Sequence, residues 1–119
     1  EAIVHSHAKL CTVLGLVNGR VPPICVEAVS FTDTQIIPYS LPGTPELCEN
    51  VVKALEHSPA VLLQNHGLLT VGWTVRHAAS RALALERIVY IMLACRLFGQ
   101  EPTSIPPDAL DLVRSLGAI

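Results

Sequence analysis

Two histidines near the start of the chain, His5 and His7, are separated by one residue and follow an apolar run, residues 2–4. Alternate residues of a β-strand project from the same face, so both imidazoles are expected on one side of a strand. Two neutral imidazoles on one face can bind one divalent cation, with Zn–N distances of about 2.0–2.1 Å. A third histidine, His66, follows another apolar run, residues 60–63. We therefore predict that His5, His7 and His66 bind zinc or another divalent metal.

The same residues also allow a purely structural interpretation, in which the histidine pair is hydrogen-bonded in the core and His66 fills a turn. Their position at the ends of strands, next to turns, favours a functional site, because binding and catalytic residues concentrate in loops. Other metal-binding folds fit less well. A metallo-hydrolase motif needs an acid where Lys9 stands, a cupin needs a glutamate within residues 9–13, and an amidohydrolase barrel needs about twice this length.

Short apolar runs alternate with amphipathic stretches, which is typical of an α/β domain. The pattern predicts strands over residues 2–5, 24–26, 35–39, 60–63 and 68–71, with residues 31–34 as loop. It predicts helices over residues 8–16, 45–57, 75–98 and 108–116. The helix over 75–98 is apolar on so much of its circumference that we expect the sheet on one side and another helix or subunit on the other. In the tight connection before the last strand, Gly67 is expected to adopt a positive φ.

Length and composition indicate a single domain over residues 1–119. The net charge of −2 comes without a basic cluster, so we expect neither a nucleic acid nor a membrane as partner. The four cysteines are widely spaced, which favours reduced thiols and a cytoplasmic protein. The high mean hydropathy of +0.47 suggests that the chain packs against further chain or other subunits. Because the chain begins within what looks like a strand, we expect it to be part of a longer protein.

Several further polar residues are weaker candidates for the site. Glu27 could be a site carboxylate, and Tyr39 could likewise contribute a polar group to the site. Cys11 and Cys25 could lie near the metal, although burial as small hydrophobic residues is the simpler expectation. The remaining candidates are predicted at the surface, on solvated or interface faces of helices: His57, His77, Arg81, Glu86 and Arg87.

The sequence resembles the class II aldolase/adducin family, whose type members are zinc-dependent L-fuculose-phosphate aldolases. The resemblance extends from residue 1 to about residue 100 and rests on four stretches in the same order and spacing. They are Ala2-Ile3-Val4-His5-Ser6-His7, Pro22-Pro23-Ile24, Pro38-Tyr39-Ser40-Leu41-Pro42-Gly43-Thr44-Pro45-Glu46-Leu47 and Ala60-Val61-Leu62-Leu63-Gln64-Asn65-His66-Gly67-Leu68, followed by the alanine-rich helix with Glu86.

This resemblance implies an α/β fold: three α/β/α layers around a mixed, mainly antiparallel central sheet, incomplete at its N-terminus. It also implies a homotetramer with sites between neighbouring subunits, and it assigns the metal ligands to His5, His7 and His66. The family's acid/base glutamate and its phosphate-binding loops would lie before Glu1. The tyrosine that fuculose-phosphate aldolases use as a proton donor corresponds to Val26 here, and the adjacent Glu27 could replace it.

The function that the resemblance implies is that of a metal-dependent lyase, which cleaves a C–C bond of a sugar phosphate by retro-aldol chemistry. Two alternatives remain open at this point. The first is another enzyme of the family, acting as a sugar-phosphate epimerase, dehydratase or decarboxylase. The second is a non-catalytic adducin-like assembly domain, which has no need to keep the three histidines.

Overall fold

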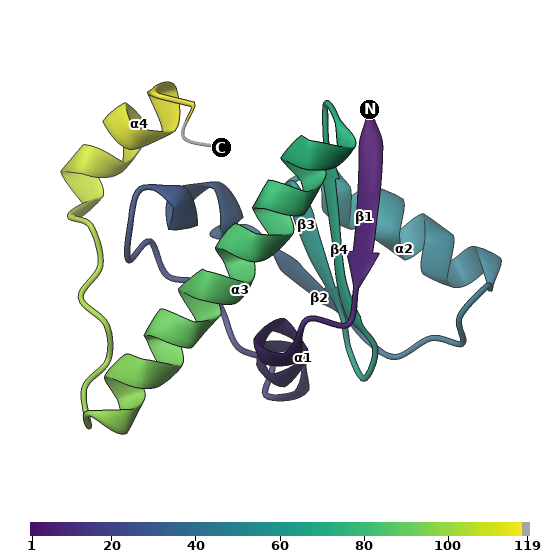
Figure 1. The fold of residues 1–119 in the computed structure, drawn as a ribbon, viewed down its shortest axis with the longest axis horizontal. Helices are drawn as coiled ribbons and strands as arrows, with labels where there is room; N and C mark the ends of the chain where they lie inside the picture. Colours follow the sequence, from purple (N-terminus) through teal and green to yellow (C-terminus); the bar gives the residue numbers. More distant parts are fainter. Residues whose placement is uncertain (118–119) are drawn as a thin grey trace.

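The computed structural model describes residues 1–117, which form four strands, four α-helices and one 3-10 helix (Figure 1). In chain order these are β1 (Ala2–Ser6), α1 (Lys9–Leu16), η1 (Glu27–Phe31), β2 (Gln35–Ile37), α2 (Pro45–Leu55), β3 (Ala60–Leu63), β4 (Gly67–Gly72), α3 (Val75–Leu97) and α4 (Pro107–Ser115).

The strands form one sheet in the order β1-β4-β3-β2. β1 pairs antiparallel with β4, β3 pairs antiparallel with β4, and β2 pairs parallel with β3. The predicted mixed, mainly antiparallel sheet is therefore confirmed. β3 and β4 form a hairpin, so their shared turn lies at the end of the sheet where β1 finishes.

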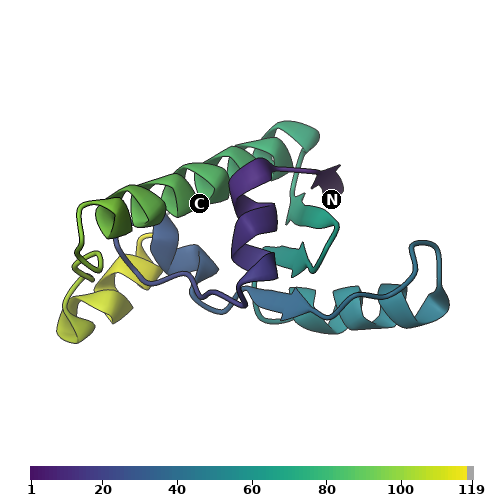
Figure 2. The same ribbon diagram turned by 90° about the horizontal axis from the view of Figure 1, so that it is seen from below.

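Helices cover both faces of this sheet. α3 contacts β1 and β4, and α1 packs beside it against β3 and β4. α2 contacts β2 and β3 from the opposite face, so the helices lie on two sides of the strands (Figure 2). The described residues thus form the three α/β/α layers that were predicted.

The core consists of two clusters separated by the sheet. The strand β3 is buried along its whole length and contributes to both, because its successive side chains point to opposite faces. Leu62 packs with Leu85, Ile88 and Met92 of α3, whereas Val61 and Leu63 pack with α2. Each fully buried aliphatic side chain stabilises the fold by about 1.5–3 kcal/mol.

The predicted strand over residues 24–26 is absent, and this prediction was wrong. Pro22 and Pro23 have no backbone N–H to donate to a sheet, and the Ile24 N–H donates instead to the Pro22 carbonyl at 2.8 Å. The chain then forms η1, which includes Phe31, although residues 31–34 had been predicted as loop. The Phe31 side chain is fully buried, so η1 belongs to the core.

Two helix starts follow the local rules. Thr44 caps α2 by accepting a hydrogen bond from the Leu47 N–H at 3.4 Å, with Pro45 at the first helical position. Thr74 caps α3 by accepting one from the His77 N–H at 3.1 Å. Both helices therefore begin where the sequence predicted them to begin.

The helix α1 has no residue at its own N-terminus whose side chain caps it. Its N-cap is Ala8, and no acidic residue lies in its first turn. The carboxylate of Glu86, on α3, accepts hydrogen bonds from the Leu10 and Cys11 N–H groups, each at 2.9 Å. The prediction that Glu86 lies on a solvated or interface face was wrong, because three-dimensional packing places it at this helix end.

The outer face of α3 remains exposed and partly apolar. Leu83, Tyr90 and Leu97 follow one another at intervals of seven residues and are 73%, 61% and 81% exposed. The inner face is buried against the sheet, as expected for this helix. Among the described residues, no helix is both long and apolar enough to cross a lipid bilayer.

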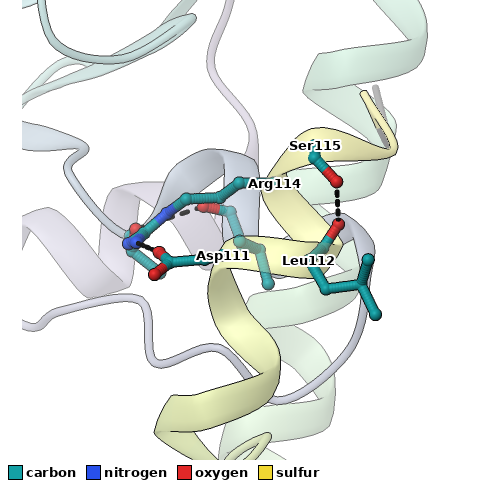
Figure 3. A network of polar contacts seen from close by, with 6 residues as sticks. Asp111, Leu112, Arg114 and Ser115 are labelled. Carbon is teal, nitrogen blue, oxygen red and sulfur yellow. Dashed lines mark hydrogen bonds and ion pairs between the residues drawn. The ribbon is translucent and has the colours of Figure 1, made fainter.

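The last helix, α4, packs against η1 after a proline-containing connection. Its polar contacts are local: the Arg114 guanidinium donates to the Asp111 carboxylate at 3.4 Å, and the Ser115 hydroxyl donates to the Leu112 carbonyl at 2.6 Å (Figure 3). Both contacts lie within α4 itself, at the surface and far along the chain from the three histidines.

Candidate metal centre

The three predicted histidines come together at the end of the sheet where β1 finishes. His5 lies in β1, His7 follows that strand directly, and His66 lies in the turn of the β3–β4 hairpin. The antiparallel register places Ser6 opposite Leu68, which brings the hairpin turn next to His7. Strand pairing thus joins residues that are about 60 positions apart in the chain.

The hairpin turn depends on two residues that flank His66. Asn65 adopts a positive φ of 61°, and the His66 N–H donates to the Leu63 carbonyl at 3.0 Å. Gly67 does not have a positive φ, so that prediction was wrong. Its role is close approach: a β-carbon at residue 67 would collide with the Ser6 carbonyl oxygen and lie 3.2 Å from the His7 Cδ2 atom.

The three rings lie close together, at the spacing of a candidate metal site. One ligand atom from each of His5, His7 and His66 can be chosen so that all three lie within 4.8 Å of one another. The ring centroids are 5.1 Å apart for His5 and His7, 4.7 Å for His5 and His66, and 5.1 Å for His7 and His66. Three imidazole nitrogens are a donor set that suits zinc and other borderline divalent ions.

A hydrogen bond orients one of these rings. The His5 Nδ1 atom lies 3.0 Å from the Leu68 carbonyl oxygen. In the tautomer with the proton on Nδ1, this nitrogen donates to the carbonyl and leaves Nε2 as the free lone pair. Backbone contacts of this kind hold metal-binding histidines in one tautomer and one orientation.

The electrostatics of the cluster favour the neutral form of His66. Partial burial lowers the pKa of His66 below its ordinary value, and the neighbouring His5 and His7 lower it further. Neutral imidazole is the form that binds metal, because protonation removes the lone pair. His5 and His7 are exposed and His66 is half-buried, so one side of the cluster is open to a ligand.

The weaker candidates lie outside this cluster. Glu27 belongs to η1, where its carboxylate accepts a hydrogen bond from Arg87 at 2.8 Å, and a catalytic role for it stays a prediction. The neighbouring Val26 is 44% exposed and Tyr39 is 59% exposed. Cys11 is fully buried in the core, as expected for a small hydrophobic residue.

The other histidines are at the surface, as predicted. His57 is exposed just after α2, and His77 lies in the first turn of α3, where its Nδ1 accepts from the Trp73 N–H at 3.3 Å. Arg81 donates from its Nη1 to the Val71 carbonyl at 2.7 Å, which ties α3 to the end of β4.

Comparison with protein families gives a match over most of the chain. The model of the class II aldolase and adducin N-terminal domain matches residues 1–93. A 5-methylthioribulose-1-phosphate/5-deoxyribulose-1-phosphate aldolase from Rhodospirillum rubrum is 31% identical over 114 residues, which are 94% of this chain and 51% of that protein. An L-fuculose phosphate aldolase from Escherichia coli is 34% identical over 95 residues, 78% of this chain and 44% of that protein.

Solved structures agree with these sequence relatives. An L-fuculose 1-phosphate aldolase superposes with a TM-score of 0.81 at 26% identity, covering 98% of this chain and 55% of that one. The enzyme of the same activity from Thermus thermophilus superposes with a TM-score of 0.69 at 25% identity, covering 82% and 53% of the two chains. The chain spans about half the length of the curated relatives it matches.

Proposed function

The chain belongs to the class II aldolase and adducin family, and on this premise we propose that it carries the metal centre of an aldolase-type lyase. The protein of which it forms part cleaves a C–C bond of a sugar phosphate by retro-aldol chemistry. The convergence of His5, His7 and His66 is the observation that carries the proposal.

In this proposal the three histidines hold a divalent cation, with zinc as the first candidate. When bound, the metal supplies a Lewis acid that polarises a substrate carbonyl and stabilises negative charge developing on its oxygen. The donor set supports this assignment, because three neutral imidazoles leave the charge of the cation uncompensated and leave coordination positions free.

The residues of the chain have distinct tasks around that cation. The Leu68 carbonyl holds the His5 ring in the orientation that frees Nε2. The hairpin turn presents His66 towards β1, and the open side beside the exposed His5 and His7 admits the substrate oxygens. In this proposal the site binds and orients the substrate next to a fixed cluster of ligands, which is one source of rate acceleration.

Proton transfer is assigned to groups other than the three histidines. We assign the main acid/base carboxylate and the phosphate-binding loops to the part of the whole protein before Glu1. Glu27 is proposed as an additional acid/base group beside Val26, supported by its carboxylate and its place in the chain. Its ion pair with Arg87 would have to open for that role.

The substrate class is a ketose 1-phosphate. The names of two relatives, an L-fuculose phosphate aldolase and a 5-methylthioribulose-1-phosphate/5-deoxyribulose-1-phosphate aldolase, support it. The products would then be a dihydroxyacetone-phosphate-type fragment and an aldehyde. The exposed apolar stripe of Leu83, Tyr90 and Leu97 supports a homo-oligomer, with the tetramer as the proposed form. A cytoplasmic location stays a prediction.

Metal content and turnover test the proposal in the full-length protein. Elemental analysis is expected to find about one zinc or other divalent ion per subunit in the wild type and in the His57→Ala control, and none in His66→Ala. Cleavage of L-fuculose 1-phosphate or 5-methylthioribulose 1-phosphate, followed as release of dihydroxyacetone phosphate, is expected to disappear with the metal. Unchanged metal content in His66→Ala would reject the site, and a metal-loaded wild type that cleaves neither substrate would reject the aldolase reaction.

A further inference from the structure

Glu86 is bound to the helix that follows the histidine pair. Its Oε1 atom accepts a hydrogen bond from the Leu10 N–H and its Oε2 atom accepts one from the Cys11 N–H, each at 2.9 Å. The first turn of a helix leaves N–H groups without intrahelical partners and carries a partial positive charge. Glu86 satisfies two of these groups with a negative charge, from a helix 75 residues further along the chain.

The first turn of α1 is also where the metal-binding segment ends. His7 is followed by Ala8, the N-cap, and α1 begins at Lys9. The Ala8 carbonyl accepts from the Thr12 N–H at 2.9 Å and from the Thr12 hydroxyl at 2.8 Å. The backbone of His7 is therefore fixed on one side by β1 and on the other by the start of α1.

The opposite end of α1 is attached to the turn that carries His66. The Gln64 side-chain amide donates to the Gly15 carbonyl at 3.2 Å and to the Asn18 side-chain oxygen at 3.0 Å. Gln64 precedes His66 by two residues. α1 thus makes a second connection between His7 and His66, in addition to the pairing of β1 with β4.

Glu86 links this connection to the sheet. α3 packs directly on β1, which carries His5, and on β4, which pairs with it. A carboxylate on α3 that is bound to α1 therefore fixes α1 relative to the strand of His5. We infer that Glu86 is a positioning residue that sets the metal affinity of the three-histidine site without touching the metal. This inference rests on the proposed function.

The pair of hydrogen bonds to the start of α1 requires a carboxylate at residue 86. The Leu10 and Cys11 N–H groups each donate to a different oxygen of Glu86, and an ionised carboxylate offers only acceptors. In Glu86→Gln one of the two positions becomes an NH₂ group, which would face an N–H donor, so one of the two hydrogen bonds is lost. Glu86→Asp keeps both oxygens but is shorter by one methylene group, so it is expected to hold α1 less closely.

The experiment measures zinc affinity in the full-length protein, by competition with a chromogenic chelator. Glu86→Gln is expected to weaken zinc binding by about tenfold, as loss of a supporting contact around a metal site does. Glu86→Asp is expected to fall between Glu86→Gln and the wild type. The control, Glu49→Gln on the exposed face of α2, is expected to match the wild type. The visible spectrum of the cobalt-substituted protein is expected to change in Glu86→Gln, reporting an altered ligand geometry.

A second variant separates positioning from simple stabilisation of α1. Ala8→Ser places a local cap on α1 and is combined with Glu86→Gln, with Ala8→Ser alone as its control. The local cap is expected to restore the thermal midpoint but not the zinc affinity or the cobalt spectrum. Zinc affinity that is unchanged in Glu86→Gln, or that returns together with the thermal midpoint, would overturn the inference while leaving the metal site intact. A wild type without zinc affinity would instead overturn the proposed function.

Discussion

Gly67 lies so close to the Ser6 carbonyl oxygen that no β-carbon fits between them. Gly67 opens β4 directly after His66, and Ser6 is the residue between His5 and His7. The contact therefore joins the two chain segments of the candidate metal centre through their backbones. It explains why a glycine stands at this position, although its φ is one that any residue could adopt.

Gly67→Ala is expected to destabilise the protein by about 1–3 kcal/mol, because the new methyl group must push the hairpin away from β1. It is also expected to weaken metal binding, since the hairpin carries His66. Urea denaturation of the metal-free protein and zinc titration measure the two effects separately.

Gly15→Ala is the matched control for this change. A β-carbon at residue 15 would meet its nearest atoms at 3.9 and 4.0 Å, which is ordinary van der Waals contact. Alanine also favours a helix over glycine by about 1 kcal/mol, so stability is expected to stay equal or rise. Equal stabilities of the two variants would contradict the proposed contact.

Metal binding is expected to stabilise the full-length protein. A ligand present at about 100 times its dissociation constant raises the free energy of unfolding by about 2.7 kcal/mol if it binds only the folded state. Removal of the metal with a chelator should lower the thermal midpoint accordingly, in the wild type and in His57→Ala. If His66→Ala responded to zinc and chelator as the wild type does, the three-histidine site would be excluded.

Cys11 is expected to resist alkylation in the folded protein. Burial raises the pKa of its thiol well above the ordinary value, and the Glu86 carboxylate raises it further through a hydrogen bond and its charge. Cys48 is exposed on α2 and serves as the internal reference. Iodoacetamide at mildly alkaline pH, followed by peptide mass spectrometry, should label Cys48 first and Cys11 only after unfolding. Equal labelling rates of Cys11 and Cys48 in the folded protein would show that the Cys11 thiol is not buried against Glu86.

Glu27→Gln is expected to reduce stability by less than about 1 kcal/mol at neutral pH, because its partner Arg87 is on the surface and solvent screens the pair. The pKa of Glu27 is lowered from 4.5, mainly by its own backbone N–H and further by Cys25 and Arg87. A carboxyl group whose pKa is lowered in the folded state stabilises the protein at pH values above its ordinary pKa. This stabilisation is lost as the pH falls through the lowered pKa.

Urea denaturation at neutral pH and at pH values below 4.5 measures this difference. The wild type and Glu27→Gln are expected to differ slightly at neutral pH and to converge in acid. A difference that grows in acid would mean that the ionised carboxylate does not stabilise the fold. A large loss of aldolase turnover at neutral pH with unchanged stability would support a catalytic role for Glu27.

Much of the architecture follows from local sequence patterns. The short, continuous apolar run over residues 60–63 favours a buried strand, and Thr44 with Pro45 marks a helix start wherever the helix lies. The histidine spacing predicted the cluster, because His5 and His7 share a strand face and His66 lies in a turn beside apolar strands. The strand and helix starts depend on neighbouring residues, so the sequence predicts them directly, whereas the meeting of His66 with the other two histidines also needs β1 to pair with β4.

Other features depend on segments that meet only in the folded chain. The sequence around Glu86 resembles any charged helix face, and only the packing of α3 against α1 brings its carboxylate to the Leu10 and Cys11 amides. The need for glycine at residue 67 likewise comes from β1 and not from the turn itself. Local propensities act over a few residues, whereas these contacts require strand pairing and helix packing to be complete. The sequence by itself therefore predicted which residues form the candidate centre, and the tertiary structure decided what brings them together and holds them in place.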